Sequence, residues 1–111
     1  MKIHWQDYNE VTVVELRGEV DGEVTEPLRN AITEIAGQQR AGIVLDMSDV
    51  SFIDGPGLEL LLWVRDYCRQ NRIQLRLAGP DENCRKILEI TRLQDEFGCH
   101  AELAEAVKSF A

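Results

Sequence analysis

The spacing of apolar residues changes several times along the chain, and each change predicts a secondary-structure element. Runs rich in β-branched residues predict strands at Val11 to Leu16 and at Gly42 to Met47, and a weaker strand at Ile3 to Asp7. The unbroken apolar run Ile43 to Leu45 fits a strand that is buried on both faces. Alternating apolar residues predict a further strand at Ile73 to Ala78.

Between these strands, apolar residues recur three and four positions apart, which is the spacing of an amphipathic helix. The predicted helices cover Val24 to Gln38, Pro56 to Asn71, Glu82 to Ile90 and Glu102 to Phe110. Pro27 and Pro56 fall in first turns, where the missing N–H of proline removes no hydrogen bond. The pattern predicts connections at Arg17 to Gly22 and at Ser48 to Ile53.

The predicted elements follow the order ββαβαβα(β)α, in which the strand in parentheses is a short edge strand between Leu93 and Cys99. Strands that alternate with helices indicate a parallel sheet with right-handed crossovers. The short gap at Asn9–Glu10 predicts one antiparallel hairpin at the start. We therefore expect an α/β fold in which residues 1–111 form a single domain, with a mixed, mostly parallel sheet of four to five strands and about four helices.

The most informative segment, Ile43 to Leu62, leads from a strand into the beginning of a helix. Between the two lies the turn Asp54-Gly55-Pro56-Gly57. The N-terminus of a helix carries unpaired N–H groups and a partial positive charge, so it is a natural place for a binding or regulatory site. Gly55 permits unusual backbone angles and Pro56 stiffens the first helical turn. We expect the turn to be pre-shaped for a partner, which reduces the entropy lost on docking.

On a helical wheel, most apolar residues of the predicted helix at Pro56 to Asn71 gather on one side. The side expected to face the sheet consists of Leu60, Leu61, Val64, Tyr67 and Cys68. Leu58 and Leu62 fall instead among charged residues, next to the turn. The wheel leaves alternatives open: the two leucines form an exposed contact strip, the last helix or a loop covers them, or the helix is rotated from this estimate.

Composition and charge narrow the possible functions. A chain of 111 residues is long enough for one core, and its net charge of −8 disfavours binding to nucleic acid while it allows a basic partner. No apolar run approaches the ~20 residues that span a bilayer. The N-terminal residues show no secretory signal. We therefore expect a cytoplasmic protein that does not insert into a membrane.

No arrangement typical of catalysis or of cofactor binding is visible. The three cysteines form no CxxC pair, and the sequence has no phosphate-binding glycine motif and no Ser-His-Asp arrangement. We expect no enzymatic activity, no cofactor and no metal. Asp46, Asp49 and Asp54 lie close together in the sequence and suggest a Mg²⁺ site. Aspartate is also common at turns and helix starts, and this second interpretation is preferred.

These segments, taken in order, resemble the STAS domain, a family typified by bacterial anti-sigma factor antagonists. The similar segments span nearly the whole chain and are Leu16–Asp21, Ile43–Asp54, Gly57–Leu58, Ile73–Pro80 and Ile87–Phe97. The resemblance implies the STAS fold and a role in partner switching. In that family, the antagonist binds a kinase-like anti-sigma factor, and the kinase breaks the complex by phosphorylating a Ser or Thr at the start of the second helix.

The chain departs from the family pattern at the phosphorylated position. The resemblance matches Asp21 with the family's loop acid and Asp54 with its turn acid, and it places Gly55 at the phosphoacceptor position. Neither Gly55 nor Pro56 has a hydroxyl group, so this turn cannot be phosphorylated. The chain is then either a constitutive binder or part of a system that does not switch by phosphorylation.

The resemblance thus implies a non-catalytic protein-binding module that binds a kinase-like anti-sigma factor. Its expected contact residues are Asp21, Asp54, Gly55, Pro56, Gly57, Leu58 and Leu62. The alternative is a STAS-like accessory subunit of an ABC-type lipid transporter, seated on the ABC ATPase. A nucleotide-binding protein would need a phosphate site at the helix start, where Asp54 is a poor neighbour for an anion. Ser48 and Ser51 are nearby hydroxyls, preferred as ordinary turn residues over substitute phosphoacceptors.

Overall fold

The structure is a computed structural model that describes residues 2–93 and 97–110. Its centre is a five-stranded sheet in the order β1-β2-β3-β4-β5, in which only β1 and β2 are antiparallel. The strands are β1 (Lys2–Tyr8), β2 (Val11–Val20), β3 (Gly42–Ile53), β4 (Gln74–Ala78) and β5 (Cys99–His100). The mixed sheet and the first hairpin are confirmed, and a short edge strand is present, although it begins only at Cys99, the end of the predicted segment. Residues 94–96 of the predicted link before the edge strand lie outside the described residues.

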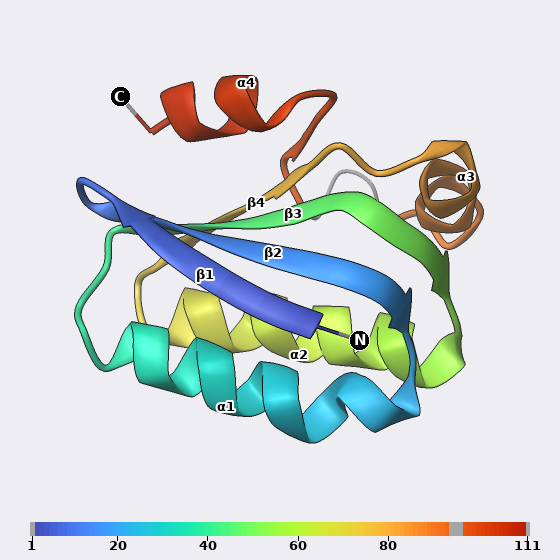
Figure 1. The fold of residues 1–111 in the computed structure, drawn as a ribbon, viewed down its shortest axis with the longest axis horizontal. Coiled ribbons are helices and arrows are strands. Elements are labelled where there is room, and N and C mark those ends of the chain that lie inside the picture. Colours follow the sequence, from blue (N-terminus) through green and yellow to red (C-terminus); the bar gives the residue numbers. More distant parts are fainter. Residues whose placement is uncertain (1, 94–96, 111) are drawn as a thin grey trace.

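Helices cover both faces of the sheet. The helices are α1 (Thr25–Ala36), α2 (Gly55–Gln70), α3 (Glu82–Ile90) and α4 (Leu103–Lys108). Figure 1 shows α1 and α2 on one face, α4 on the other, and α3 at one end of the sheet. The four predicted helices are confirmed, although the first begins later because Gly22–Val24 form a 3-10 turn. Within the described residues, no helix has the length and apolar character that crossing a membrane requires.

The alternation of side chains along the strands creates two cores. The larger core lies between the sheet and helices α1 and α2, and it includes Val14 and Leu45 from the strands. A smaller cluster lies on the other face, and its buried members are Val11, Val13, Val44, Ala78 and Ala106. Leu103, Val107 and Phe110 pack against this cluster from the α4 side, so the last helix buries an apolar face.

β3 continues through the segment that the sequence pattern predicted to be a connection. In its pairing with β2 the register shifts twice, and each shift inserts one residue into β3, first near Ser48 and then at Ser51. The buried residues Met47, Val50 and Ile53 are therefore three positions apart instead of two. The prediction of a connection at Ser48 to Ile53 was therefore wrong. The strand could not be recognised from its sequence, because a spacing of three between buried residues is typical of neither a strand nor a helix.

β2 is also longer than predicted. It extends to Val20, which pairs with Ile53 and is fully buried. Gly18 has a φ of 103°, a conformation that favours glycine, and it lies between the two register shifts. The predicted loop at Arg17 to Gly22 is therefore reduced to the short turn after Val20. As a result, β2 and β3 end side by side at one corner of the sheet.

Candidate functional site

The predicted site residues lie at the corner where β2 and β3 end. The N–H of Asp54 donates a hydrogen bond of 3.2 Å to the carbonyl of Val20, which joins the two strand ends. Gly22 and Pro56 also face each other, because a Cβ placed on Gly22 would lie 3.7 Å from the Cβ of Pro56. The turn that contains Asp21 therefore lies beside the start of α2.

The carboxylates of Asp21 and Asp54 both cap helices. Oδ1 of Asp54 accepts a hydrogen bond from the N–H of Gly57 at 2.7 Å. Oδ1 of Asp21 accepts one from the N–H of Glu23 at 2.9 Å, at the start of the 3-10 turn. Both aspartates are half-buried. Each carboxylate satisfies an otherwise unpaired N–H group, so both fix the backbone of the corner whether or not they also touch a partner.

Two of the site glycines have contrasting environments. Gly57 is buried, and a Cβ at this position would lie 1.9 Å from the carbonyl oxygen of Val20. Gly55 is exposed, and an added Cβ would have no other atom within 4 Å. Gly55 is the first residue of α2 and is not among the glycines with positive φ. The expectation that it supplies an unusual backbone conformation was wrong, because the turn has already been made at Asp54.

Leu58 and Leu62 are neither exposed nor sealed inside the core. Both are half-buried and pack against the larger core. The guanidinium of Arg29 in α1 lies 5.1 Å from the ring centroid of Trp63, which stacks on Tyr67 at 4.9 Å. At about 100° per residue, Trp63 and Tyr67 occupy the opposite flank of α2 from the two leucines. Leu58 and Leu62 therefore form one flank of α2, beside charged residues but in contact with the core, and α4 lies on the other face of the sheet (Figure 1).

Phe52 is an exposed apolar residue at this corner that the sequence pattern did not single out. Its side chain is 49% exposed, and in the sheet it pairs with Glu19. The inserted residue Ser51 changes the alternation just before it, so Phe52 points outward while Ile53 points into the core. A strand pattern read without its bulge cannot reveal this orientation.

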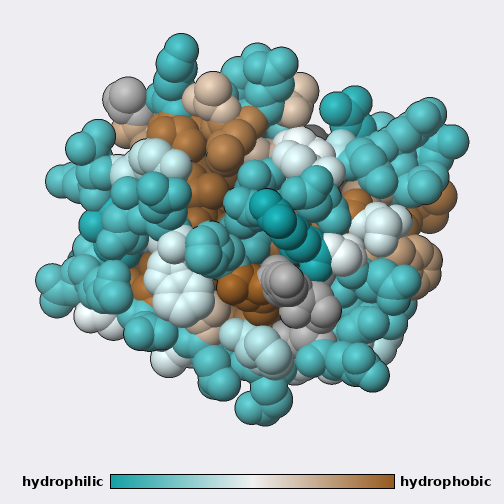
Figure 2. All heavy atoms as spheres, viewed as in Figure 1, coloured by the Kyte–Doolittle hydropathy of each residue, from teal (hydrophilic) through white to brown (hydrophobic). Residues whose placement is uncertain are grey.

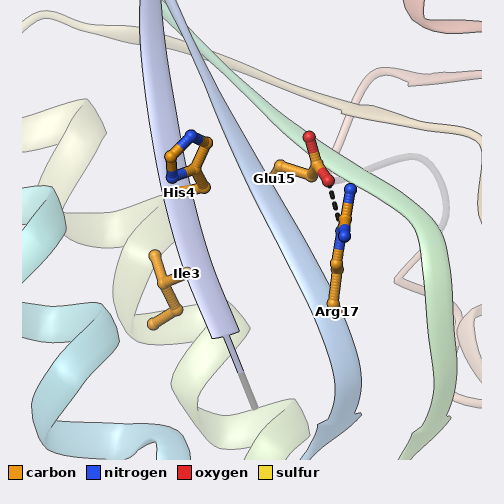
Figure 3. Close-up of a pocket in the computed structure, with 4 residues that line it drawn as sticks. All are labelled: Ile3, His4, Glu15 and Arg17. Carbon is orange, nitrogen blue, oxygen red and sulfur yellow. Dashed lines mark hydrogen bonds and ion pairs between the residues drawn. The ribbon is translucent and has the colours of Figure 1, made fainter.

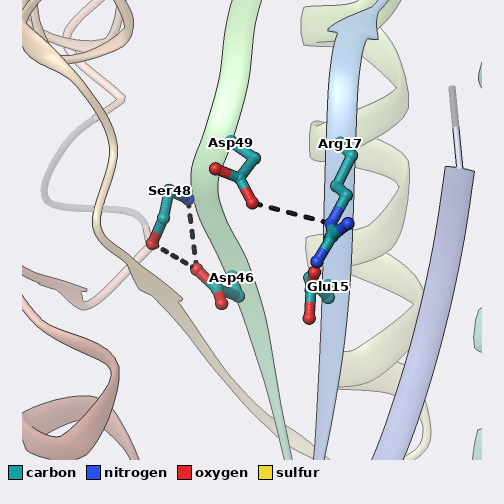
Figure 4. A network of polar contacts seen from close by, with 5 residues as sticks. All are labelled: Glu15, Arg17, Asp46, Ser48 and Asp49. Atoms are coloured by element: carbon teal, nitrogen blue, oxygen red, sulfur yellow. Dashed lines mark hydrogen bonds and ion pairs between the residues drawn. The ribbon is translucent and has the colours of Figure 1, made fainter.

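A network of polar side chains lies on β2 and β3 before the corner (Figure 4). The hydroxyl of Ser48 donates to Oδ1 of Asp46 at 2.6 Å. Arg17 binds Glu15 at 2.5 Å and lies 3.6 Å from Asp49. The hydrogen bond and charge of Glu15 raise the pKa of Arg17. Asp46 and Asp49 are thus engaged by neighbours, and among residues 2–93 and 97–110 no three His, Cys, Asp or Glu side chains are grouped to hold a metal ion.

The hollow beside the hairpin is separate from the corner. It has a volume of about 450 Å³ and is lined by Ile3 and His4 of β1 and by Glu15 and Arg17 of β2 (Figure 3). None of these four residues was predicted to belong to the site. Glu15 and Arg17 already bind each other across this hollow, so it offers few unpaired polar groups to a ligand.

Charge distinguishes the corner from much of the surface. The segments 18–28 and 41–64 each contain four Asp or Glu residues, and neither contains Lys or Arg. Both segments end at or pass through the corner. An excess of one sign of charge attracts a partner of the opposite sign and raises its association rate. The corner is therefore better suited to a basic protein surface than to an anionic ligand.

Together these features define a small α/β domain with a mixed sheet and a rigid, acid-capped turn before its second helix. The family model of the STAS domain matches residues 2–106, and the chain belongs to this family. It is 29% identical over 91 residues to a STAS-domain containing protein of Pseudomonas aeruginosa, which is 82% of this chain and 88% of that relative.

Solved structures share the fold. An anti-sigma factor antagonist from Mycobacterium paratuberculosis is 22% identical, with a TM-score of 0.84 over 97% of this chain and 92% of the other. A sulfate transporter family protein from Wolinella succinogenes is 20% identical, with a TM-score of 0.79 over 92% of this chain and 85% of the other. The same architecture thus occurs in proteins described as different in function, so the fold alone does not identify the function.

Proposed function

We propose that this chain is a non-catalytic protein-binding module of the anti-sigma factor antagonist type, which binds a kinase-like anti-sigma factor through the corner at the start of α2. Membership of the STAS family and the fold shared with an anti-sigma factor antagonist support this class of function. The observation that carries the proposal is the shape of the turn. Gly55 and Pro56 are exposed, and the backbone that carries them is held by the hydrogen bond from the N–H of Gly57 to the side chain of Asp54.

The turn is rigid before any partner arrives. Asp54 accepts the N–H of Gly57 with its side chain, and its carbonyl accepts the N–H of Leu58 at 2.8 Å. Gly57 packs directly against the backbone at Val20. Little conformational entropy is then lost on docking, which favours affinity. Exposed Phe52 and the flank formed by Leu58 and Leu62 supply apolar surface next to this turn.

The proposed complex is not released by phosphorylation at the turn. A phosphate would add a charge of up to about −2 beside Asp54 and would oppose docking. Gly55 and Pro56 offer no hydroxyl to accept it. Ser48 and Ser51 are exposed, but the hydroxyl of Ser48 is bonded to Asp46 and both residues lie where β3 bulges. We therefore propose binding that is constitutive, or regulated through the partner.

The alternative is an accessory subunit that sits on the ATPase of an ABC-type lipid transporter. The observation that favours it is the absent hydroxyl, because such a subunit needs no phosphorylation switch. The same corner would serve for docking in both cases. The two functions differ in the identity of the partner, and this is what an experiment has to determine.

The test is capture of partners on the immobilised full chain, followed by mass spectrometry and calorimetry with the purified partner. An ATPase-fold anti-sigma kinase supports the proposal, and an ABC ATPase supports the alternative. Gly55→Arg fills open space, so we expect a folded protein with affinity reduced at least about tenfold, or ~1.4 kcal/mol. Ile90→Arg, at an exposed apolar residue of α3, is the matched control and should bind normally.

Equal affinity of the Gly55→Arg variant and the control would show that the corner is not the docking surface. Replacing Leu58 or Leu62 with Asp is a weaker test, because both leucines pack on the core and the substitution would cost stability as well.

A further inference from the structure

β1 forms one border of the sheet, and the described part of the chain contains no strand that pairs with its outer side (Figure 1). An edge strand presents N–H and C=O groups that can pair with another strand. β1 is seven residues long, whereas β5 at the other border has two. The sheet therefore has one long open edge.

β1 lacks the features with which proteins usually protect such an edge, namely proline, bulges and charges in the middle of the strand. Its pairing with β2 runs without a register shift. Four consecutive residues, Ile3 to Gln6, carry no formal charge when His4 is neutral, and the charged residues Lys2 and Asp7 lie toward the two ends of the strand. Trp5 and Tyr8 are 36% and 45% exposed, so β1 holds two of the four exposed large hydrophobic residues in the described chain. Figure 2 shows this side of the molecule, where apolar surface appears between hydrophilic side chains.

We propose that β1 is a homodimerisation surface, on which two copies of this chain pair their β1 strands antiparallel and form one continuous ten-stranded sheet. The edge itself does not oppose a second copy: the net charge of −8 favours separate molecules, but on β1 the charges of Lys2 and Asp7 cancel, so a neutral strand meets a neutral strand.

The unequal edges decide the symmetry of the assembly. A head-to-tail contact would pair β1 with the two-residue β5 and would continue into an open filament. Only β1 against β1 gives a long ladder, and this contact closes after two copies. In the strand order β2 separates β3 from β1, so the end of β3, where α2 begins, does not lie on the edge that pairs in the dimer.

The length of β1 also fixes the register. Full antiparallel overlap of Lys2–Tyr8 with itself puts Trp5 on the two-fold axis, opposite Trp5 of the other copy, and puts His4 opposite Gln6. Directly opposite residues in such a pair have Cβ atoms about 4.5–5.5 Å apart, and diagonal neighbours about 7–8 Å. Cross-strand aromatic pairs are among the favourable ones.

The first test measures molecular mass by sedimentation as the protein concentration rises from micromolar to millimolar. The mass of one chain is 12.6 kDa, and we expect a rise toward twice this value. Trp5→Lys places like charges opposite each other, so dimerisation should weaken at least about tenfold. Ile90→Lys adds the same charge to an exposed residue elsewhere and should dimerise normally. A constant monomer mass at all concentrations overturns the proposal.

The second test checks the register by disulfide formation in a Cys99→Ser background, in which the remaining cysteines, Cys68 and Cys84, are buried. Trp5→Cys should give a disulfide-linked dimer under mild oxidation, because opposite Cβ atoms lie near disulfide distance. Gln6→Cys is the matched control and should not, because its counterpart is a diagonal neighbour. A dimer that Trp5→Cys does not cross-link uses another surface and also contradicts the proposal. Neither test involves the partner, so failure here leaves the proposed function intact.

Discussion

Gly55 and Gly57, two positions apart in the turn before α2, have opposite requirements. Gly57 lets the helix start approach the backbone at Val20, and no side chain fits there. Gly55 faces open space. Packing therefore allows a serine at position 55, and the absent hydroxyl is not imposed by the fold. Packing therefore makes the glycine at position 57 a structural requirement, whereas it leaves the glycine at position 55 open to a functional explanation.

This contrast predicts different effects on stability. Gly57→Ala should lower the free energy of unfolding by about 1–3 kcal/mol or more, because its Cβ must displace backbone at Val20. Gly55→Ala should change it by less than about 1 kcal/mol, and in the stabilising direction, because alanine is the better helix former. Urea unfolding of the two variants measures both values. Equal losses at the two positions would mean that the corner is packed differently.

Sequence reasoning placed some residues of the corner well and others poorly. The cap at Asp54 and the proline in the first turn depend on local chemistry, which the sequence contains. The orientation of Leu58 and Phe52 depends on how α2 is rotated on the sheet and on the bulge at Ser51. Those features are set by contacts with distant parts of the chain, so a helical wheel or a strand alternation cannot supply them.

The elements show the same division. α3 has its predicted ends, and its start is marked locally by Asp81, whose Oδ1 accepts the N–H of Cys84 at 2.8 Å. The second half of β3 was missed because its strand conformation depends on pairing with β2 and is not visible in its own alternation. A helix with a capping residue can therefore be predicted from its own sequence. A bulged strand is recognised only together with the neighbouring strand to which it pairs.

α4 is a short cover over the smaller cluster, and its attachment depends on one aromatic residue. The ring of Phe110 lies over Gly42 of β3, where an added Cβ would be 2.4 Å from the ring. The guanidinium of Arg76 lies 4.9 Å from the centroid of the same ring. With only six helical residues, α4 is held mainly by packing of this kind.

We predict that Gly42→Ala displaces Phe110 and loosens α4 without unfolding the sheet. The expected cost is about 1–3 kcal/mol, with faster hydrogen exchange in α4 and increased binding of an apolar dye to the uncovered cluster. A double-mutant cycle provides the control, since in a Phe110→Ala background the clash is absent and the Gly42→Ala cost should largely disappear. Additive costs would show that Phe110 is not the obstructing group.

At the scale of the whole molecule, two buried thiols couple stability to alkaline pH. Cys68 lies in the larger core, and burial raises its pKa to about 12. Burial, followed by the neighbouring carboxylate of Asp81, raises the pKa of Cys84 to about 12 as well. Cys84 also links α3 to β3, with its Sγ 3.8 Å from the carbonyl of Val50. The folded state therefore holds both protons more tightly than the unfolded chain does.

The sign of the pH effect follows from these raised values. The stabilisation by the neutral thiols is complete below the unfolded pKa of about 9 and is lost as pH rises toward the folded pKa of about 12. Each thiol contributes a slope of at most about 1.4 kcal/mol per pH unit. Urea unfolding at several pH values above 9 should therefore show a steeper loss for the native sequence than for Cys84→Ala. Cys99→Ser, at the exposed cysteine, should keep the native slope, and a native-like slope in Cys84→Ala would show that other groups cause the alkaline loss.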